Sequence, residues 1–130
     1  MSLSAVVLAA GEGKRMGSDL PKVLHPVAGR PMVLRVLDAL FALRPTPDPL
    51  VVVVGRRGER VRRAVLDARL EAPPRFVAQR RRLGTGHALL QAEPIVAGAA
   101  PALLVVYGDV PLLRPTTLQA LLDVHRAHRP

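Results

Sequence analysis

Short runs of aliphatic residues alternate along this chain with segments of helical periodicity, and this alternation limits the fold more than any other feature. Runs with the length and β-branched content of buried strands cover residues 4–10, 50–54, 75–78 and 102–107. Helices are expected at residues 32–43, 58–72, 85–93 and 115–128, the third ending before Pro94, and residues 11–29 are expected to form a loop. Strands that alternate with helices favour βαβ units around a parallel sheet.

The predicted fold class is α/β, with a Rossmann-like, doubly wound, mostly parallel sheet in the strand order 3-2-1-4. In this order the first and fourth strands are neighbours at the switch point, where open α/β sheets bind ligands. Residues 11–17 and 108–109 are therefore expected to meet there. The fourth strand remains an apolar edge, which predicts pairing with a second copy as a homo-oligomer, cover by the last helix, or an unstable fragment.

Composition narrows the partners of the 130-residue chain, whose length fits one domain. It has no cysteine, which excludes disulfides and thiol catalysis, and the expected location is a reducing cytoplasm. No apolar run approaches the roughly 20 residues that cross a bilayer, so no membrane partner is expected. The net charge of +9 is consistent with an anionic partner. Nucleic acid is not the expected one, because only 2% of residues are aromatic and stacking platforms are missing.

The glycine-rich segment after the first strand is the first candidate site. Gly11 and Gly13 let the backbone approach a ligand closely, and successive N–H groups can cradle phosphate oxygens. Lys14, Arg15 and Lys22 add positive charge nearby, which favours phosphate binding over a simple turn.

A dinucleotide-binding turn is an alternative interpretation of the same glycines. No acidic residue follows the second strand, where such a turn needs one for the ribose, but Arg56 and Arg57 are placed to suit the 2′-phosphate of NADP. The long charged segment after the glycines argues against this alternative, because a Rossmann helix begins directly after them.

Two further positions carry chemistry. Asp109 follows the fourth strand beside the predicted phosphate cradle, where a carboxylate is placed to hold Mg²⁺ together with phosphate oxygens. Gln79 follows the third strand, and its amide is suited to reading the edge of a base. Gly84 and Thr85 begin a helix whose N–H groups can face an anion, although spacing alone favours a loop and a helix cap. Residues 80–82 are all arginine. The sequence favours neither of two interpretations for them, contact with phosphates or simple exposure to solvent.

Several motifs together resemble the sugar-1-phosphate nucleotidyltransferase family. They cover residues 8–16, 20–25, 28–32, 83–88 and 106–112. Within that family they are most similar to the uridylyltransferase domain of bacterial bifunctional N-acetylglucosamine-1-phosphate uridylyltransferase/glucosamine-1-phosphate acetyltransferases.

The resemblance implies transfer of UMP from UTP to N-acetylglucosamine 1-phosphate, with release of pyrophosphate. The implied partners are UTP and a sugar 1-phosphate, and the implied cofactor is Mg²⁺, held by Asp109. Arg15 and Lys22 are the implied catalytic residues, which neutralise the triphosphate. The implied nucleotide-binding residues are Leu8, Ala9, Ala10, Gly11, Gly13, Gln79, Gly84, Thr85 and Gly108.

The chain also departs from the family pattern. Lys14 stands where the family often has threonine, and the arginines 80–82 follow Gln79 where the family tends to have an acid. The family domain continues beyond the length of this chain and there supplies most sugar contacts and a second metal ligand, usually Asn or Asp; this sequence has no Asn. Residues 1–130 are thus expected to be the nucleotide-binding half. A binding or assembly module without turnover, and a related guanylyl- or cytidylyltransferase, stay open.

Overall fold

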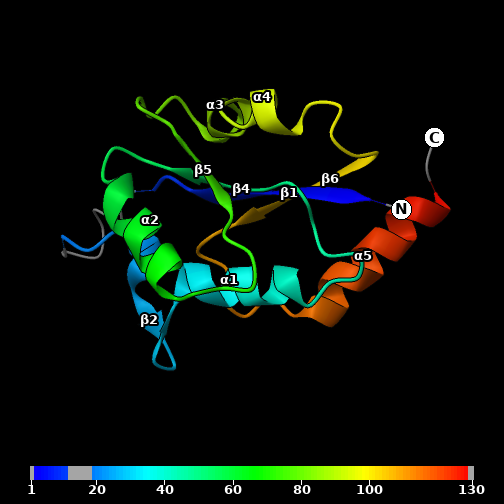
Figure 1. Cartoon of the computed structure of the whole chain (residues 1–130), viewed down its shortest axis with the longest axis horizontal. Helices are drawn as coiled ribbons and strands as arrows, with labels where there is room; N and C mark the ends of the chain where they lie inside the picture. Colours follow the sequence, from blue (N-terminus) through cyan, green and yellow to red (C-terminus); the bar gives the residue numbers. More distant parts are fainter. Residues whose placement is uncertain (1, 12–18, 129–130) are drawn as a thin grey trace.

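The computed structural model describes residues 2–11 and 19–128, which form a sheet between two layers of helices (Figure 1). The sheet contains β1 (Leu3–Ala9), β4 (Leu50–Val54), β5 (Arg75–Ala78) and β6 (Ala102–Tyr107), in the order β5-β4-β1-β6. All three neighbouring pairs are parallel. The predicted α/β class and the strand order 3-2-1-4 are confirmed, and each strand lies within one residue of its predicted bounds.

One face of the sheet is covered by α1 (Met32–Phe41), α2 (Gly58–Asp67) and α5 (Pro115–Ala127). The first of these helices is buried on most sides, as its apolar composition predicts. On α5, Leu118 and Leu122 are buried against the core. The sequence spacing of Leu118, Leu121, Leu122 and His125 is that of one helix face. Leu121 and His125 are nevertheless exposed, so the buried stripe of this helix is narrower than the spacing indicates.

The opposite face is covered by α3 (Thr85–Leu90) and α4 (Glu93–Val96). Ala88 of α3 and Ala92, which directly precedes α4, pack against β1 and β4. The prediction of one helix ending before Pro94 is wrong. Pro94 instead lies in the first turn of α4, where a residue needs no intrahelical N–H partner and proline is tolerated. The predicted helix at 58–72 also ends early, at Asp67, because Arg69 adopts a left-handed backbone with φ of 51°.

A small hairpin begins within residues 11–29, the segment expected to be loop, and ends just beyond it. The 3₁₀ helix η2 (Lys22–Leu24) leads into β2 (Pro26–Val27), which pairs antiparallel with β3 (Arg30–Pro31). Ala28 and Gly29 have φ of 51° and 80°, the left-handed pair that closes a two-residue hairpin turn.

Hydrogen bonds from two arginines connect this hairpin to α1. Arg35 donates to the carbonyl oxygens of Val27 and Ala28 at 2.7 and 2.8 Å. Arg30 donates two hydrogen bonds to Asp38, and this bonding raises the pKa of Arg30 against the opposing effect of burial. The hairpin and α1 together hold η2, and with it Lys22, at the carboxyl end of the sheet.

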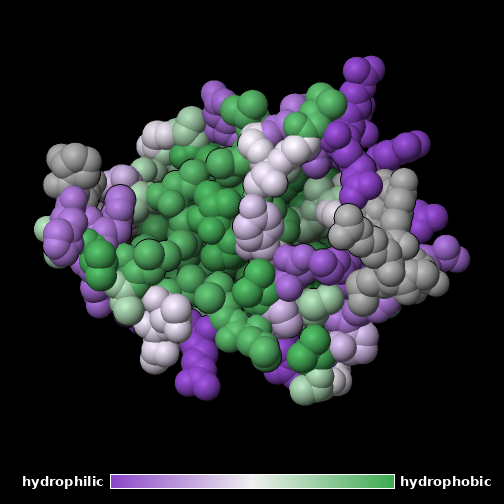
Figure 2. Space-filling model, turned by 180° about the vertical axis from the view of Figure 1, so that it is seen from behind, coloured by the Kyte–Doolittle hydropathy of each residue, from purple (hydrophilic) through white to green (hydrophobic). Residues whose placement is uncertain are grey.

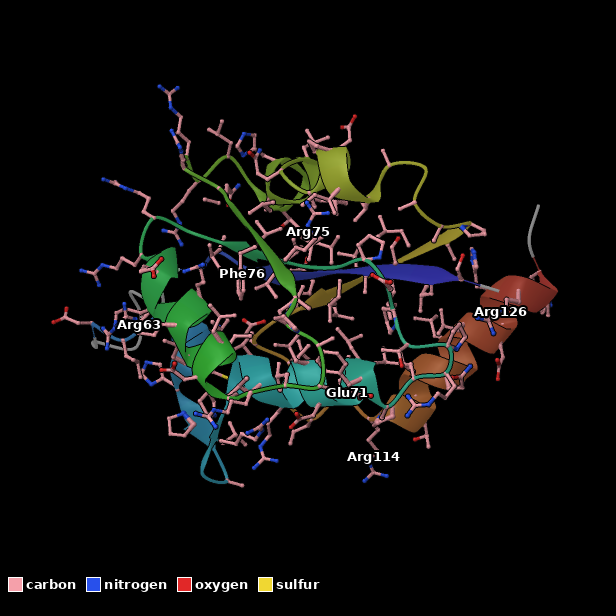
Figure 3. The ribbon with its side chains drawn as sticks, viewed as in Figure 1. Arg63, Glu71, Arg75, Phe76, Arg114 and Arg126 are labelled. Atoms are coloured by element: carbon pink, nitrogen blue, oxygen red, sulfur yellow. The ribbon has the colours of Figure 1, made fainter. Side chains whose placement is uncertain are left out.

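The two edge strands of the sheet, β5 and β6, differ in how their side chains are covered. Phe76, labelled with Arg75 on β5 in Figure 3, packs on the α1 side of the sheet, and its neighbour Val77 packs on the α3 side. On β6 the side chains alternate: Leu104 and Val106 are buried, while their neighbours Leu103, Val105 and Tyr107 are exposed.

No helix in the described part of the chain is long and apolar enough to cross a membrane.

Close approach of β1 and β6 at their carboxyl ends requires glycine at position 108. The Gly108 N–H donates to the Leu8 carbonyl at 2.8 Å. A Cβ added at Gly108 would lie 3.2 Å from side-chain carbons of both Ala9 and Val23. Gly108→Ala is therefore expected to lower the free energy of unfolding by about 1–3 kcal/mol.

The matched control is Gly86→Ala in α3, where no atom lies within 4 Å of the added Cβ. It is expected to leave stability unchanged or raise it by up to about 1 kcal/mol. Urea denaturation followed by circular dichroism measures both variants. Equal losses of stability would contradict the close-approach explanation.

Candidate functional site

A cavity of about 330 Å³ lies at the carboxyl ends of β1 and β6. It is built from the segment after β1, η2, the segment after β5, the start of α3 and the end of β6. Its described lining residues are Leu8, Ala10, Gly11, Lys22, Val23, Gln79, Arg82, Gly84, Thr85, Ala88, Tyr107 and Asp109.

Most of the predicted site residues meet at this cavity. They are Leu8, Ala10, Gly11, Lys22, Gln79, Gly84, Thr85 and Asp109. Ala9 and Gly108 are buried beside it, where Gly108 bonds to the backbone of β1. Gly13 and Arg15 lie outside the described residues, as does Lys14. Gly11 and Asp109, nearly one hundred positions apart, thus share one cavity because β1 and β6 are neighbours.

Lys22 and Asp109 form an ion pair in the cavity wall, with 3.0 Å between Lys22 Nζ and Asp109 Oδ2. The two side chains are 44% and 32% exposed. At such exposure water screens the attraction, so the pair adds little to stability. Both groups are accessible, and an entering anion or cation would meet a group of opposite charge without any large movement of the backbone.

Gln79 is placed by backbone and side-chain bonds together. Its N–H donates to the Val54 carbonyl at 2.7 Å, which continues the β4–β5 pairing. Its side chain is largely buried, and Nε2 donates to the Gly84 carbonyl at 3.1 Å. Gly84 has a φ of 98°, which a residue with a Cβ rarely adopts, and this turn brings its carbonyl round to Gln79.

The same Nε2 atom lies 3.0 Å from Nδ1 of His87. No hydrogen bond joins Gln79 Oε1 to a described residue. Because no buried side-chain polar atom of the described part lacks a partner, this oxygen is an accessible atom of an otherwise buried side chain. Because Gln79 lines the cavity, this oxygen is the amide atom open to a ligand.

The donor set in the cavity suits a magnesium ion that arrives with phosphate. No group of three or more His, Cys, Asp or Glu side chains that could hold a metal is found within residues 2–11 and 19–128. Magnesium, however, is usually bound through one or two carboxylates, substrate phosphates and water. One accessible carboxylate, Asp109, beside a cationic side chain fits that mode and does not fit a cage built from protein alone.

Tyr107 and Arg82 also line the cavity and were not assigned a role from the sequence. Tyr107 is the last residue of β6. Its position at the end of a strand beside the switch point is the sequence feature that could have marked it as a cavity residue. For Arg82 the sequence left phosphate contact and plain exposure equally open, and the structure places it at the cavity.

The arginines after β4 lie elsewhere. Arg57 and Arg60 donate to the Asp19 carbonyl at 3.1 and 3.3 Å and thereby hold the segment that leads to η2. Neither they nor Arg56 line the cavity. Arg63, labelled on α2 in Figure 3, is exposed, as expected for a solvated helix face.

Comparison with known proteins gives a consistent result. Residues 5–130 match a family model described as the MobA-like NTP transferase domain. The chain is 53% identical over 121 residues to the bifunctional protein GlmU of Paraburkholderia xenovorans, and 54% identical over 127 residues to that of Cupriavidus taiwanensis. These matches cover 93% and 98% of this chain but 25% and 26% of the relatives. The chain therefore spans about a quarter of the length of the curated relatives it matches.

A solved structure of Rv0371c from Mycobacterium tuberculosis is similar with a TM-score of 0.76 and 28% identity. The match covers 98% of this chain and 62% of that one. A second structure of that protein, described as a complex with manganese, is similar with a TM-score of 0.68 and 25% identity, over 98% of this chain and 61% of that one. These neighbours confirm the fold class.

Because the Lys22–Asp109 pair is partly exposed, we expect that either side chain can be removed with little effect on the stability of the fold. Lys22→Ala and Asp109→Ala are each expected to change the free energy of unfolding by less than about 1 kcal/mol. Chemical denaturation measures the change. Leu37→Ala, at a fully buried position of α1, is the positive control and should lose about 2–5 kcal/mol. A loss of control size in either charge variant would show that the pair holds the fold together.

Proposed function

The chain belongs to the MobA-like NTP transferase domain family, and on this premise we propose that it is the nucleotide-binding half of a sugar-1-phosphate uridylyltransferase. Family membership makes it a nucleotidyltransferase domain. The proposed reaction transfers UMP from UTP to N-acetylglucosamine 1-phosphate. Its support is the motif resemblance together with identities above 50% to GlmU proteins. The single observation that carries the proposal is the convergence of Lys22, Gln79 and Asp109 on one cavity.

The reaction needs no nucleophile from the protein. A phosphate oxygen of the sugar phosphate forms a bond to the α-phosphorus of UTP, and the bond from that phosphorus to the bridging oxygen breaks. Pyrophosphate leaves with the electron pair. The chain's contribution is therefore position and charge: the Lys22 ammonium neutralises negative charge on the triphosphate and on the leaving pyrophosphate. Gln79 and the Gly84–Thr85 backbone hold the base.

Asp109 is the residue proposed to hold the divalent cation, and the manganese complex of the related Rv0371c supports a divalent ion in this fold. When bound, the ion supplies further neutralisation of the triphosphate. Lys22 then exchanges its contact with Asp109 Oδ2 for a phosphate oxygen. The ion pair thus keeps both groups oriented toward the cavity before the nucleotide arrives.

The exposed face of β6 supports the proposal that residues 1–130 form only half of the functional unit. Leu103, Val105 and Tyr107 are 44%, 37% and 51% exposed on the face that α5 does not cover. Figure 2, the view from behind, shows a broad apolar surface at this side of the molecule. Contiguous apolar surface on an edge strand is normally covered. We propose that the sugar-binding part of the longer relatives covers it, and that the isolated chain pairs with a second copy there.

The proposed specificity is tested by titrating the chain with UTP, CTP, GTP and NADPH in the presence of Mg²⁺, using calorimetry. UTP is expected to bind most tightly. Lys22→Ala and Asp109→Ala are each expected to weaken UTP binding by about tenfold or more, because each removes a charged contact. Arg63→Ala, which removes an exposed charge that is not part of the cavity lining, is the matched control and should bind as the wild type does.

A pyrophosphate assay with sugar 1-phosphates completes this test. UTP binding without pyrophosphate release supports the half-domain proposal, whereas release shows that the chain is sufficient for turnover. Preferential binding of NADPH would favour the dinucleotide-binding alternative, and preference for CTP or GTP would favour a related cytidylyl- or guanylyltransferase. Unchanged UTP affinity in both charge variants would refute the proposed site.

Self-association through β6 is tested by sedimentation. Val105→Lys places a charge on the exposed β6 face and is expected to shift the isolated chain from dimer toward monomer. Val124→Lys adds the same charge to an exposed position on α5 and should leave the dimer unchanged. A wild-type chain that stays monomeric and stable at high concentration would contradict the proposed pairing.

A further inference from the structure

The hydrogen bonds around Gln79 determine which atom of its amide faces the cavity. The Gly84 carbonyl oxygen can only accept, so the amide atom 3.1 Å from it must be the nitrogen, Nε2. That nitrogen has two hydrogens. The first is directed to the Gly84 oxygen, and the second is directed to Nδ1 of His87, 3.0 Å away.

His87 must therefore accept a hydrogen bond at Nδ1. An imidazole nitrogen accepts only when it carries no proton, so the ring is neutral with its proton on Nε2. The alternative tautomer, and the doubly protonated ring, would set an N–H group against the amide N–H of Gln79. The contact between the two residues is compatible with one state of His87.

Gln91, one turn further along, bonds to the backbone of His87: its Nε2 donates to the His87 carbonyl at 3.0 Å. The same Nε2 lies 3.4 Å from Nε2 of the ring, and this longer contact is not a hydrogen bond in this tautomer because both nitrogens carry hydrogen. His87 is partly buried between the two glutamines. The backbone bond holds this turn of the chain in place, and Nδ1 of the ring holds the Gln79 amide.

We propose that His87 is a positioning residue that fixes the Gln79 amide with Oε1 toward the cavity, and that this orientation sets the preference for uracil over cytosine. The inference rests on the proposed function, because it assumes that Gln79 contacts the base of a nucleotide. His87 itself lines no part of the described cavity wall and acts only through Gln79.

The chemistry of the two bases supplies the discrimination. Oε1 is an acceptor. Uracil carries an N–H donor at N3, whereas cytosine has a bare acceptor nitrogen at that position, so the fixed oxygen attracts the first and repels the second. If the amide were free to turn over, Nε2 would face the base instead and would favour cytosine. Loss of the His87 acceptor removes one of the two bonds that prevent this turn, leaving only the bond to Gly84.

The test measures the ratio of CTP to UTP dissociation constants, with Mg²⁺, for the whole chain and its variants. His87→Leu removes the acceptor and is expected to lower this ratio by about threefold to tenfold, the effect of one hydrogen bond. His87→Asn can place an amide oxygen near the position of Nδ1 and is expected to restore the wild-type ratio. Lys22→Ala weakens both nucleotides through their phosphates and should leave the ratio unchanged.

A second measurement does not require the His87→Leu variant to fold. Long-range ¹H–¹⁵N NMR of the wild-type chain at neutral pH should show His87 as the neutral tautomer with its proton on Nε2, the signal being assigned by its loss in His87→Asn. A protonated Nδ1 would overturn the proposal. A folded His87→Leu variant with an unchanged ratio, or with equal weakening of UTP and CTP, would also overturn it while leaving the uridylyl specificity intact. Absence of a UTP preference in the wild type would instead refute the proposed function, and this inference with it.

Discussion

The site depends on the parallel pairing of β1 with β6, which places two segments from opposite ends of the chain side by side. The two strands are in register from Leu3 with Ala102 to Leu8 with Tyr107, and the Gly108 N–H extends the pairing to the Leu8 carbonyl. Because parallel strands end at the same edge, Gly11 and Asp109 emerge together. The rest of the cavity wall is arranged around this pair: α3 contacts β1, and η2 is held by α1 and α2.

The cavity is organised by small polar interactions rather than by strong ones. Lys22 and Asp109 hold each other in a half-exposed pair, and Gln79 is held by the Gly84 carbonyl and by Nδ1 of His87. Such contacts add little to stability, but they orient donors and acceptors before a ligand enters. The core beneath, made of fully buried side chains such as Val7, Leu37 and Val52, supplies the rigidity.

Much of this arrangement was predictable from the sequence because it follows from periodicity. Continuous aliphatic runs mark strands buried on both faces, and the crossover rule then orders them. The β2–β3 hairpin was not predicted, because two-residue strands carry no periodic signal and Ala28 rarely adopts a positive φ. The division of residues 85–96 into two helices was missed since proline was taken as a stop, although it also suits a first turn. The contact between Gln79 and His87 joins a strand end to a helix and depends on one left-handed glycine between them, which spacing alone does not reveal.

Asp109 stands two residues beyond a strand that has only one hydrogen-bonded neighbour within the described residues. Fraying of that strand displaces the carboxylate directly, because nothing but a short turn separates them. Any polypeptide that completes the sheet beside β6 therefore also steadies Asp109, the residue proposed to hold the metal. In the proposed function, completion of the sheet and affinity for a metal-bound nucleotide are then thermodynamically linked, and each strengthens the other by the same factor.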